Sequence, residues 1–430
     1  MPKPTIIILG GGISGLTLAY TLLPYMHLFN LHLIEKEETV GGWMGTDHST
    51  GFFFEKGPRV FRKDRSHHLL SLIHRLGLSE EVINVSPQGR KRYVWDGGRL
   101  KKMPQLSWGL IKGIFRDLRE PPSCSHDESV WDFACRRFNA EVASEIFDPV
   151  VTGIYGGDSK HLSFQSCFPL YAKLECKYGS LIKGMIKERN SFNSALFGLK
   201  RGTESLINQL KMKLTSYLHL QEEVLAITEI GDQFEIKTSQ GVYFADHLFS
   251  ALPPQVIGKL LIPELCQIAL KGVVAVHLGY HQKVLHQEGF GYLTRMSSQE
   301  EAMGVIFDSN AFLEHNKTEE ETRLTVKLKD ETLSDEEAVA SALRVIHKHL
   351  KIKATPDKVL ITRAEGVFPQ LHVGYSTWIQ EVLHIMQQRS PYCTLSGNYL
   401  EGVSVNDCIA YSQKMALQYL QKKGIVCSTP

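Results

Sequence analysis

The chain has 430 residues, enough for about two to four domains, and 43% of them are apolar and 22% charged. This balance excludes disordered, collagen-like and coiled-coil chains. The 48 basic and 46 acidic residues leave a net charge of +2, which argues against a dedicated nucleic-acid-binding protein.

The first 23 residues are apolar, but glycines interrupt them and only Lys3 adds positive charge, so a signal peptide or a membrane anchor is not expected. Residues 5–9 (TIIIL) are instead typical of a strand buried on both faces. Gly10, Gly12 and Gly15 follow in the pattern G-x-G-x-x-G, and the next apolar residues recur at helical spacing. Strand, glycine turn and helix together predict a site for a pyrophosphate at a helix N-terminus.

A second short strand is predicted over residues 31–34, and it ends at Glu35, 20 residues after Gly15. An acidic residue at this offset accepts hydrogen bonds from the ribose hydroxyls of a bound dinucleotide. Residues 40–43 (VGGW) follow, and this second glycine signature resembles that of FAD-binding oxidoreductases of the amine-oxidase type. The start of the chain therefore predicts a dinucleotide site and favours FAD over NAD.

Residues 90–119 contain nine basic and two acidic residues, a local charge of +7. An apolar helical face shares this segment (Leu110, Ile111, Ile114, Phe115, Leu118), and Trp108 precedes it. A basic amphipathic helix of this kind is typical of interfacial membrane binding, and a core-facing helix with a solvated basic side is the alternative. No run of about 18 apolar residues predicts a membrane-spanning helix.

An all-helical segment is predicted to continue to about residue 189. From residue 198 the pattern returns to the dinucleotide-binding type, and strand-like runs at residues 273–280, 304–308 and 324–328 predict a second sheet. Residues 397–405 (GNYLEGVSV) open a last helix. Such a helix start can present amide groups to the electron-rich edge of a reduced flavin, or the helix can simply pack on the core.

No metal site is expected. The pairs His67/His68 and His347/His349 lack the i, i+4 spacing of a helical zinc pair, and the eight cysteines show no CxxC motif. A disulfide scaffold is equally disfavoured, so we expect free thiols, with Cys167 and Cys408 as packing residues.

Taken together, the motifs resemble those of the oxygen-dependent, FAD-containing protoporphyrinogen IX oxidases, within the superfamily of flavin monoamine oxidases and other FAD-dependent oxidoreductases. The more specific stretches are EKGPRVFR at residues 55–62, FNAEVASEIFDPVVTGIYGGD at 138–158, LKRGTESL at 199–206, GFGYL at 289–293 and GVSVNDC at 402–408. The resemblance runs along nearly the whole chain, although residues 314–357 are charged and only weakly similar. Val60 also departs from the pattern, because some members have glycine there.

The resemblance implies an α/β multidomain fold like that of p-hydroxybenzoate hydroxylase. A discontinuous, Rossmann-type FAD domain (residues 1–90, 198–262 and 388–430) would carry a helical membrane-associating and substrate-channel insertion (91–197). A substrate domain built on a mixed sheet would cover residues 263–387.

The resemblance also implies non-covalent FAD and a set of residues that contact it. These residues are Gly10, Gly11, Gly12, Ile13, Ser14, Gly15, Glu35, Lys36, Gly42, Trp43, Gly57, Pro58, Arg59, Val60, Val224, Asn398, Val403, Ser404 and Val405. On the substrate side, Arg92 would face a propionate, Gly153 would line the cavity with its backbone, and Leu293 would form an apolar wall beside the macrocycle.

The implied reaction is the six-electron oxidation of protoporphyrinogen IX to protoporphyrin IX in haem biosynthesis, with dioxygen reduced to three molecules of hydrogen peroxide. The flavin N5 would accept the hydride, and no side chain would act as a catalytic acid or base. Peripheral contact with the cytoplasmic face of the inner membrane, handover of the product to a ferrochelatase and a homodimer are further expectations.

Three alternatives stay open. Coproporphyrinogen III carries four propionates instead of two and is the closest rival substrate. An amine oxidase or a carotenoid desaturase uses the same FAD scaffold. A flavin-binding protein without turnover is the third.

Overall fold

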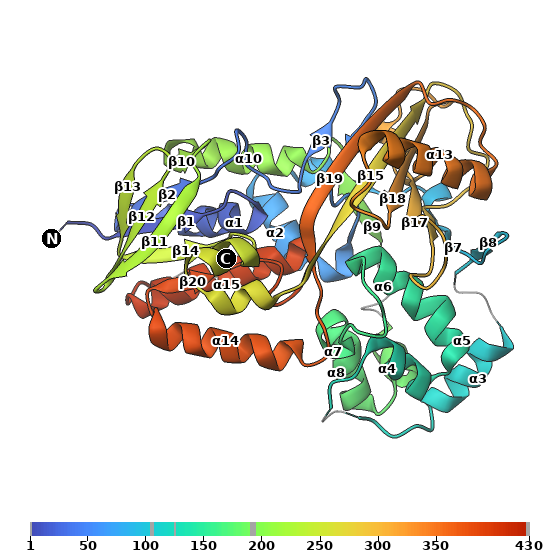
Figure 1. Cartoon of the computed structure of the whole chain (residues 1–430), viewed down its shortest axis with the longest axis horizontal. Coiled ribbons are helices and arrows are strands. Elements are labelled where there is room, and N and C mark those ends of the chain that lie inside the picture. Colours follow the sequence, from blue (N-terminus) through green and yellow to red (C-terminus); the bar gives the residue numbers. More distant parts are fainter. Residues whose placement is uncertain (1, 104–106, 124–125, 190–194, 427–430) are drawn as a thin grey trace.

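The computed structural model describes residues 2–103, 107–123, 126–189 and 195–426. Figure 1 shows an elongated molecule with a sheet at each end and a group of helices, α3 to α9, below the second sheet. The first and the last described residues both lie in the half of the molecule that holds the first sheet.

The first sheet has five parallel strands in the order β10-β2-β1-β14-β20, collected from distant parts of the chain. The strands are β1 (Thr5–Leu9), β2 (Asn30–Ile34), β10 (Leu218–His219), β14 (His247–Ser250) and β20 (Cys393–Leu395). The predicted strand over residues 5–9 is therefore confirmed, and β2 begins one residue earlier than expected.

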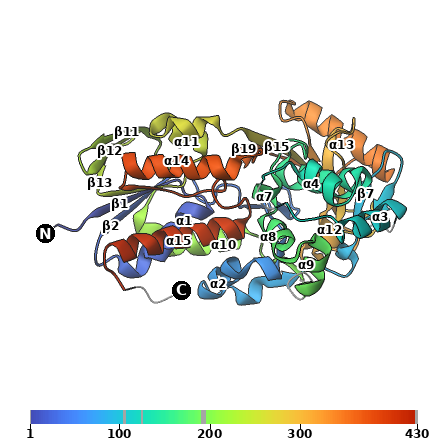
Figure 2. The same cartoon turned by 90° about the horizontal axis from the view of Figure 1, so that it is seen from below.

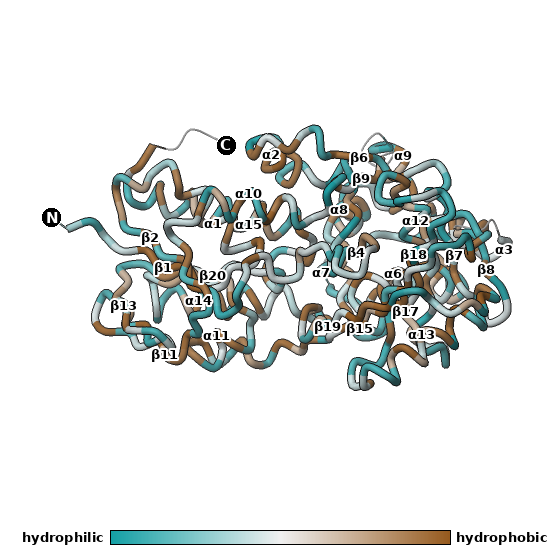
Figure 3. Tube along the Cα trace, turned by 90° about the horizontal axis from the view of Figure 1, so that it is seen from above, coloured by the Kyte–Doolittle hydropathy of each residue, from teal (hydrophilic) through white to brown (hydrophobic). Residues whose placement is uncertain are grey.

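Apolar residues of β1 serve two cores. Ile6 and Ile8 pack with helices on one face, whereas Ile7 and Leu9 pack on the other face. Because both faces are buried, polar residues do not alternate with apolar ones along this strand. Figure 2 shows α15 and α10 on one side of the sheet and α14 and α11 on the other, and the trace of β1 in Figure 3 is hydrophobic. The covering elements are α1 (Ile13–Leu22), α10 (Glu204–Leu214), α15 (Val405–Lys422), α11 (Pro254–Leu260), α14 (Tyr375–Arg389) and the strands β11 (Val224–Ile230), β12 (Gln233–Thr238) and β13 (Val242–Ala245).

The second sheet has seven strands in the order β19-β15-β18-β17-β16-β7-β8. They are β7 (Arg92–Trp95), β8 (Leu100–Lys102), β15 (Leu270–Tyr280), β16 (Gly291–Leu293), β17 (Ala302–Phe307), β18 (Thr322–Leu328) and β19 (Lys358–Pro369). The predicted second sheet is thus present. Helix α13 (Asp335–Leu350) packs on one face through a core that includes Val276, Val326 and Ile346.

Residues 92–102 depart from the expected helical insertion, because they form β7 and β8 at the edge of the second sheet. Tyr93 and Trp95 are buried in the α13 core, and β7 pairs with β16, about 200 residues further along the chain. Sequence periodicity reports local structure, and a short strand fixed by so distant a partner gives little local signal.

The helices of the insertion are α3 (Trp108–Asp117), α4 (Val130–Arg137), α5 (Ala140–Val142), α6 (Asp148–Tyr155), α7 (Phe164–Cys167), α8 (Pro169–Tyr178) and α9 (Leu181–Lys187), with a π-helical turn at Ala143–Phe147. A fully buried ion pair joins Arg137 of α4 to Asp117 of α3, with Nε and Oδ1 2.7 Å apart. Smaller elements connect the sheets: β3 (Thr46–Asp47), β4 (Phe54–Glu55), β5 (Phe61–Arg62), α2 (His67–Arg75), β6 (Val82–Asn84), β9 (Leu196–Leu199) and α12 (Asp308–Ala311).

Two expectations about the whole chain have different outcomes. None of the helices within the described ranges is long and apolar enough to cross a membrane. The expectation of free thiols is wrong for Cys176 in α8, which is disulfide-bonded, whereas Cys135, Cys167, Cys266, Cys393 and Cys408 are free. Cysteine spacing along the sequence does not report which cysteines the fold brings together.

Candidate functional site

The glycine-rich turn between β1 and α1 needs its glycines for space. A Cβ on Gly15 would lie 1.9 Å from the carbonyl oxygen of Gly10, so the helix can approach the strand only because residue 15 has no side chain. Gly10 has a φ of +96°, which favours glycine. Gly12 is the N-cap of α1, and a Cβ there would meet nothing within 4 Å. The start of α1 therefore faces open space, without an acidic side chain in its first turn.

Glu35 holds the turn from the neighbouring strand. Its Oε2 accepts a hydrogen bond of 2.6 Å from the backbone N–H of Gly11, and its Oε1 accepts one of 3.0 Å from Glu37. The backbone N–H of Glu222 donates to the carbonyl of Glu35, which brings the segment just before Val224 alongside. Lys36 lies on the surface, where it forms an ion pair with Glu37. The carboxylate thus stands beside the glycine turn, as a ribose-binding acid requires.

The second glycine signature returns to the same turn. The N–H of Gly41 donates to the carbonyl of Gly11 at 2.8 Å, and a Cβ on Gly42 would lie 3.5 Å from the α-carbon of Gly12. Trp43 follows with 41% of its surface exposed, and a Cβ on Gly57 would lie 1.9 Å from its carbonyl oxygen. Two glycine segments and residue 57 therefore form one strip of adjoining backbone, in which Gly12, Gly42 and Gly57 keep accessible surface.

Arg59 does not offer a free cation to this strip. Its buried guanidinium forms an ion pair with Asp308 and donates hydrogen bonds to Thr325 Oγ1 at 2.9 Å and to the carbonyl of Glu55 at 3.0 Å. The side chain instead fastens the segment after Pro58 to the second sheet. Val60, next in the chain, packs in a small apolar cluster with Val85 and Phe312.

The start of α15 lies against the start of α1. Ser404 caps α15 and forms a reciprocal capping box with Asp407, and a side-chain hydrogen bond links Cys408 to Ser14 of α1. Burial raises the pKa of the Cys408 thiol to about 12, which suits a packing residue. Val405 is buried in the same core as Ile6 and Ile8, on the face of the first sheet that α1 covers. The neighbouring Val403 packs against the core on the opposite face of that sheet.

Asn398 ties the loop before α15 to the second sheet, because its Nδ2 donates to the carbonyl of Val367 in β19 at 2.8 Å. Val224 begins β11 and packs against the core, and its segment reaches the site through the backbone hydrogen bonds of Glu222 to Glu35 and of Gln221 to Glu37. The structure therefore brings the predicted cofactor segments to one edge of the first sheet, with two helix N-termini side by side.

These features suit the chemistry of FAD. The uncapped start of α1, the open space before Gly12 and the carboxylate of Glu35 match the needs of a pyrophosphate and a ribose. The start of α15 adds a second positive dipole end.

The three predicted substrate residues lie on the second sheet and on α6 beside it. Leu293 of β16 pairs with Val94 of β7, two residues from Arg92. A Cβ on Gly153 of α6 would lie 2.6 Å from Cδ2 of Leu293, so the helix and the strand touch where glycine leaves room. Arg92 and Leu293 thus share one face of the sheet, and Gly153 packs on it.

Arg92 has charged and aromatic neighbours that sequence reasoning missed. Burial, and then the positive charge of Arg62, lowers the pKa of the Arg92 guanidinium, whereas Tyr171 of α8 opposes this shift. Yet Arg92 keeps an exposed surface. An exposed cation beside Arg62 and Tyr171 is a place where an anionic group of a substrate could bind.

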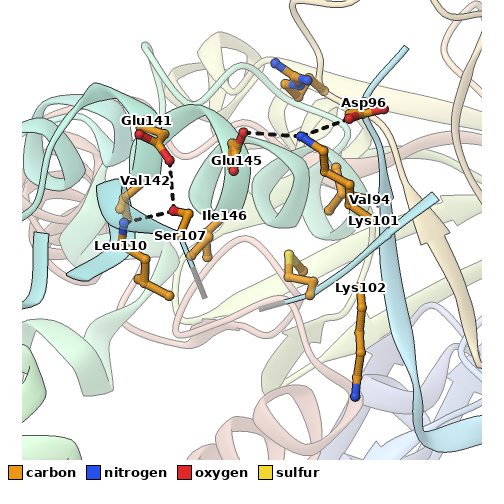
Figure 4. A pocket seen from close by; sticks show the side chains of 12 residues that line it. Val94, Asp96, Lys101, Lys102, Ser107, Leu110, Glu141, Val142, Glu145 and Ile146 are labelled. Carbon is orange, nitrogen blue, oxygen red and sulfur yellow. Dashed lines mark hydrogen bonds and ion pairs between the residues drawn. The ribbon is translucent and has the colours of Figure 1, made fainter. Parts of the chain in front are cut away.

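A pocket opens between β7–β8 and the helices α3 and α5 (Figure 4). Lys101 lies within it, 2.8 Å from Asp96 and 4.0 Å from Glu145, while Ser107 donates to Glu141 at 2.9 Å. None of the residues predicted for the site is among those that line this pocket, although Val94 is two residues from Arg92. Within the described ranges no group of three or more His, Cys, Asp or Glu residues could hold a metal ion.

The comparisons with known proteins cover nearly the whole chain. Protoporphyrinogen oxidase of Bos taurus is 30% identical over 471 residues, covering 97% of this chain and 98% of its own. Coproporphyrinogen III oxidase of Bacillus subtilis (strain 168) is 28% identical, and the match covers 95% of this chain and 96% of that protein. A crystal structure of a candidate protoporphyrinogen oxidase from Exiguobacterium sp. 255-15 superposes with a TM-score of 0.87 at 24% identity, covering 98% of this chain and all of that one.

The same fold recurs in a putrescine oxidase structure, with a TM-score of 0.70 at 17% identity over 98% of this chain. The family model "Flavin containing amine oxidoreductase" matches residues 13–384. With a cofactor edge that fits FAD and a match over most of its length, the chain belongs to the family of flavin-containing amine oxidoreductases.

Proposed function

We propose that this flavoenzyme oxidises protoporphyrinogen IX to protoporphyrin IX by six electrons, with dioxygen as acceptor and three molecules of hydrogen peroxide as by-product. The observation that carries the proposal is the face of the second sheet on which Arg92 and Leu293 lie together, with Gly153 packed against it. Relatives named protoporphyrinogen oxidase that match 97% of the chain support it.

Each substrate-side residue has a physical role in this proposal. Arg92 offers a planar cation to a propionate at the solvent-reached edge of the site. Leu293 supplies an apolar wall for the macrocycle, and Gly153 lets α6 pack directly against this wall, because a Cβ there would lie 2.6 Å from Cδ2 of Leu293. FAD, when bound, supplies the redox chemistry, because it accepts a hydride and passes the electrons to dioxygen.

The protein's own task is then to bind and to orient. The glycine turns and Glu35 would hold the nucleotide end of FAD, and the start of α15 would lie beside its ring system. Arg59 is a positioning residue, because its bonds to Asp308 and Thr325 hold the segment at residues 57–60 against the second sheet. No side chain of this chain is assigned as a catalytic acid or base.

The test is turnover of the FAD-loaded protein with protoporphyrinogen IX, followed by porphyrin fluorescence and by hydrogen peroxide. We expect about three peroxides per porphyrin, and no oxidation of putrescine or of other simple amines. Amine oxidation without porphyrin formation would contradict the proposal and would favour an amine oxidase. Coproporphyrinogen III belongs in the same assay, because the Bacillus subtilis relative is named for it.

We also propose that α3 and α9 attach the protein to the surface of a membrane, at the cytoplasmic face of the inner membrane. Trp108 and Phe115 of α3 are 78% and 56% exposed, and Ile186 of α9 is 63% exposed. Lys112, Arg116 and Arg119 lie among them, which suits anionic lipid. Handover of the product to a ferrochelatase and a homodimer belong to the same proposal.

Sedimentation with vesicles tests this attachment. Wild-type protein should sediment with phosphatidylglycerol-containing vesicles, less so at high salt, and the double variant Trp108→Ser/Phe115→Ser should stay in the supernatant. A matched control, Met212→Ser, alters an exposed apolar residue of α10 on the other lobe (69% exposed) and should leave sedimentation unchanged. Equal sedimentation of the double variant and the wild type would contradict the proposal.

A further inference from the structure

One lysine stands on the same sheet face as the substrate residues, although the sequence pattern did not single it out. Lys327 of β18 pairs with Gly304 of β17, and Gly304 pairs in turn with Leu293 of β16. Residues that are directly opposite in neighbouring strands point to the same face of a sheet. Lys327 and Leu293 therefore share one row, and Arg92 lies on that face in the next row.

The opposite face of β18 is closed. Leu324, Val326 and Leu328 point into the core beneath α13, so the alternate residues, including Lys327, point away from that core. The pKa of the Lys327 amine is lowered to about 8, first by burial and then by the positive charge of Arg59, while Asp308 opposes the shift. The amine therefore lies on the side where Arg59 fastens the cofactor-binding segment to the sheet.

The layers that cover this face leave Lys327 between them. On one side Phe54 covers His277, with ring centroids 5.2 Å apart. On the other side α6 covers the sheet, since a Cβ on Gly156, the C-cap residue of this helix, would lie 3.6 Å from the sulfur of Met303. Lys327 lies on this face between the Phe54–His277 contact and the Gly156–Met303 contact. Its row also contains Leu293, which Gly153 of α6 touches.

No hydrogen bond or ion pair joins the Lys327 amine to a partner within the described residues, in contrast to Lys329, whose Nζ donates to the carbonyls of Arg295 and Ser298. A cation that is removed from most of its water needs an acceptor. Because the side chain faces the substrate residues, the acceptor that fits best is a carboxylate of the ligand.

Resting on the proposed function, we infer that Lys327 is a second carboxylate-binding residue of the substrate site. Arg92 and Lys327 lie three strands and one row apart on this face of the sheet, roughly 16 Å at the usual strand and residue spacings. Two cations so far apart match a tetrapyrrole with carboxylates on opposite edges. Coproporphyrinogen III has a propionate on every ring, whereas the two propionates of protoporphyrinogen IX share one edge, so Lys327 would let the site bind the four-propionate substrate in addition to protoporphyrinogen IX.

The test compares the wild type, Lys327→Met, Lys327→Arg and a control, Lys358→Met, which changes an exposed lysine at the start of β19. Dissociation constants for the stable products, coproporphyrin III and protoporphyrin IX, are measured by fluorescence titration of FAD-loaded protein, and kcat/KM is measured for both porphyrinogens. In Lys327→Met the affinity for coproporphyrin III should fall about 10-fold or more, because a charge-assisted hydrogen bond is lost. Protoporphyrin IX affinity should change less than about threefold, Lys327→Arg should recover part of the loss, and the control should match the wild type.

Equal changes for both porphyrins, or no change for either, would overturn the assignment. A loss of FAD affinity in Lys327→Met without a change in porphyrin discrimination would also overturn it, because the amine would then serve the cofactor. If Lys327→Met does not fold, Lys327→Gln keeps a polar side chain and tests the same ratio. A wild type that turns over neither porphyrinogen would refute the proposed function, whereas the two dissociation constants would still decide the role of Lys327.

Discussion

The variant Gly12→Ala should lower the affinity of the glycine turn for FAD without destabilising the fold of the turn. The backbone of Gly12 (φ −70°, ψ 178°) is open to any residue, and a Cβ there would meet nothing within 4 Å. Alanine is a poorer N-cap than glycine but loses less backbone entropy on folding, so the free energy of unfolding of the apoprotein should change by less than about 1 kcal/mol.

FAD affinity should respond far more strongly. The added methyl group would occupy the space in which a pyrophosphate approaches the start of α1. The loss of one charge-assisted hydrogen bond, roughly 1.5–3 kcal/mol, corresponds to an affinity about 10- to 150-fold lower. The assay is titration of apoprotein with FAD, followed by flavin fluorescence, alongside urea unfolding.

Two other glycines serve as comparisons. Gly98→Ala, in the turn between β7 and β8, also meets open space and should leave both FAD affinity and stability unchanged. Gly15→Ala should destabilise the fold itself, since its Cβ would lie 1.9 Å from a carbonyl oxygen. A stable Gly12→Ala protein that binds FAD as tightly as the wild type would refute the reasoning, because the pyrophosphate would then not approach this turn.

Three further predictions concern binding, packing and pH. Arg92→Ala should raise the KM for a porphyrinogen about 10-fold or more while FAD stays bound, and an unchanged KM would count against a propionate contact. Arg137→Met leaves Asp117 buried without its partner and should cost about 3–5 kcal/mol of unfolding free energy in urea, whereas a loss below 1 kcal/mol would show that the pair is dispensable. Burial raises the pKa of Glu55 from 4.5 to about 7, so the folded state holds a proton that the unfolded state releases, and stability should fall by about 3 kcal/mol as pH rises through this window. Glu55→Gln should flatten that part of the pH–stability curve, and an equally steep curve in the variant would contradict the assignment.

Local pattern was enough to predict the cofactor edge. The strand at residues 5–9, the glycine turn and Glu35 follow one another within 35 residues, and each has a specific local requirement, such as the missing side chain at Gly15. The second sheet was predicted in outline, and its strands begin two or three residues earlier than expected at β15, β17 and β18.

Long-range pairing explains what sequence reasoning missed. Arg59 meets Asp308 across 249 residues, and β7 pairs with β16 across about 200, so neither contact leaves a periodic signal. Lys327 did leave a signal, because the polar residues of β18 alternate with apolar ones. Such alternation usually marks a strand with one face in water. Only the fold shows that α6 and the segment at residues 54–59 cover that face.

The most direct measurement of the central claim is anaerobic mixing of FAD-loaded protein with protoporphyrinogen IX. The account predicts that the yellow absorption of the oxidised flavin bleaches as porphyrin fluorescence appears, and that the colour returns when air is admitted. A flavin that stays oxidised in the presence of either porphyrinogen, in protein that holds FAD, would contradict it.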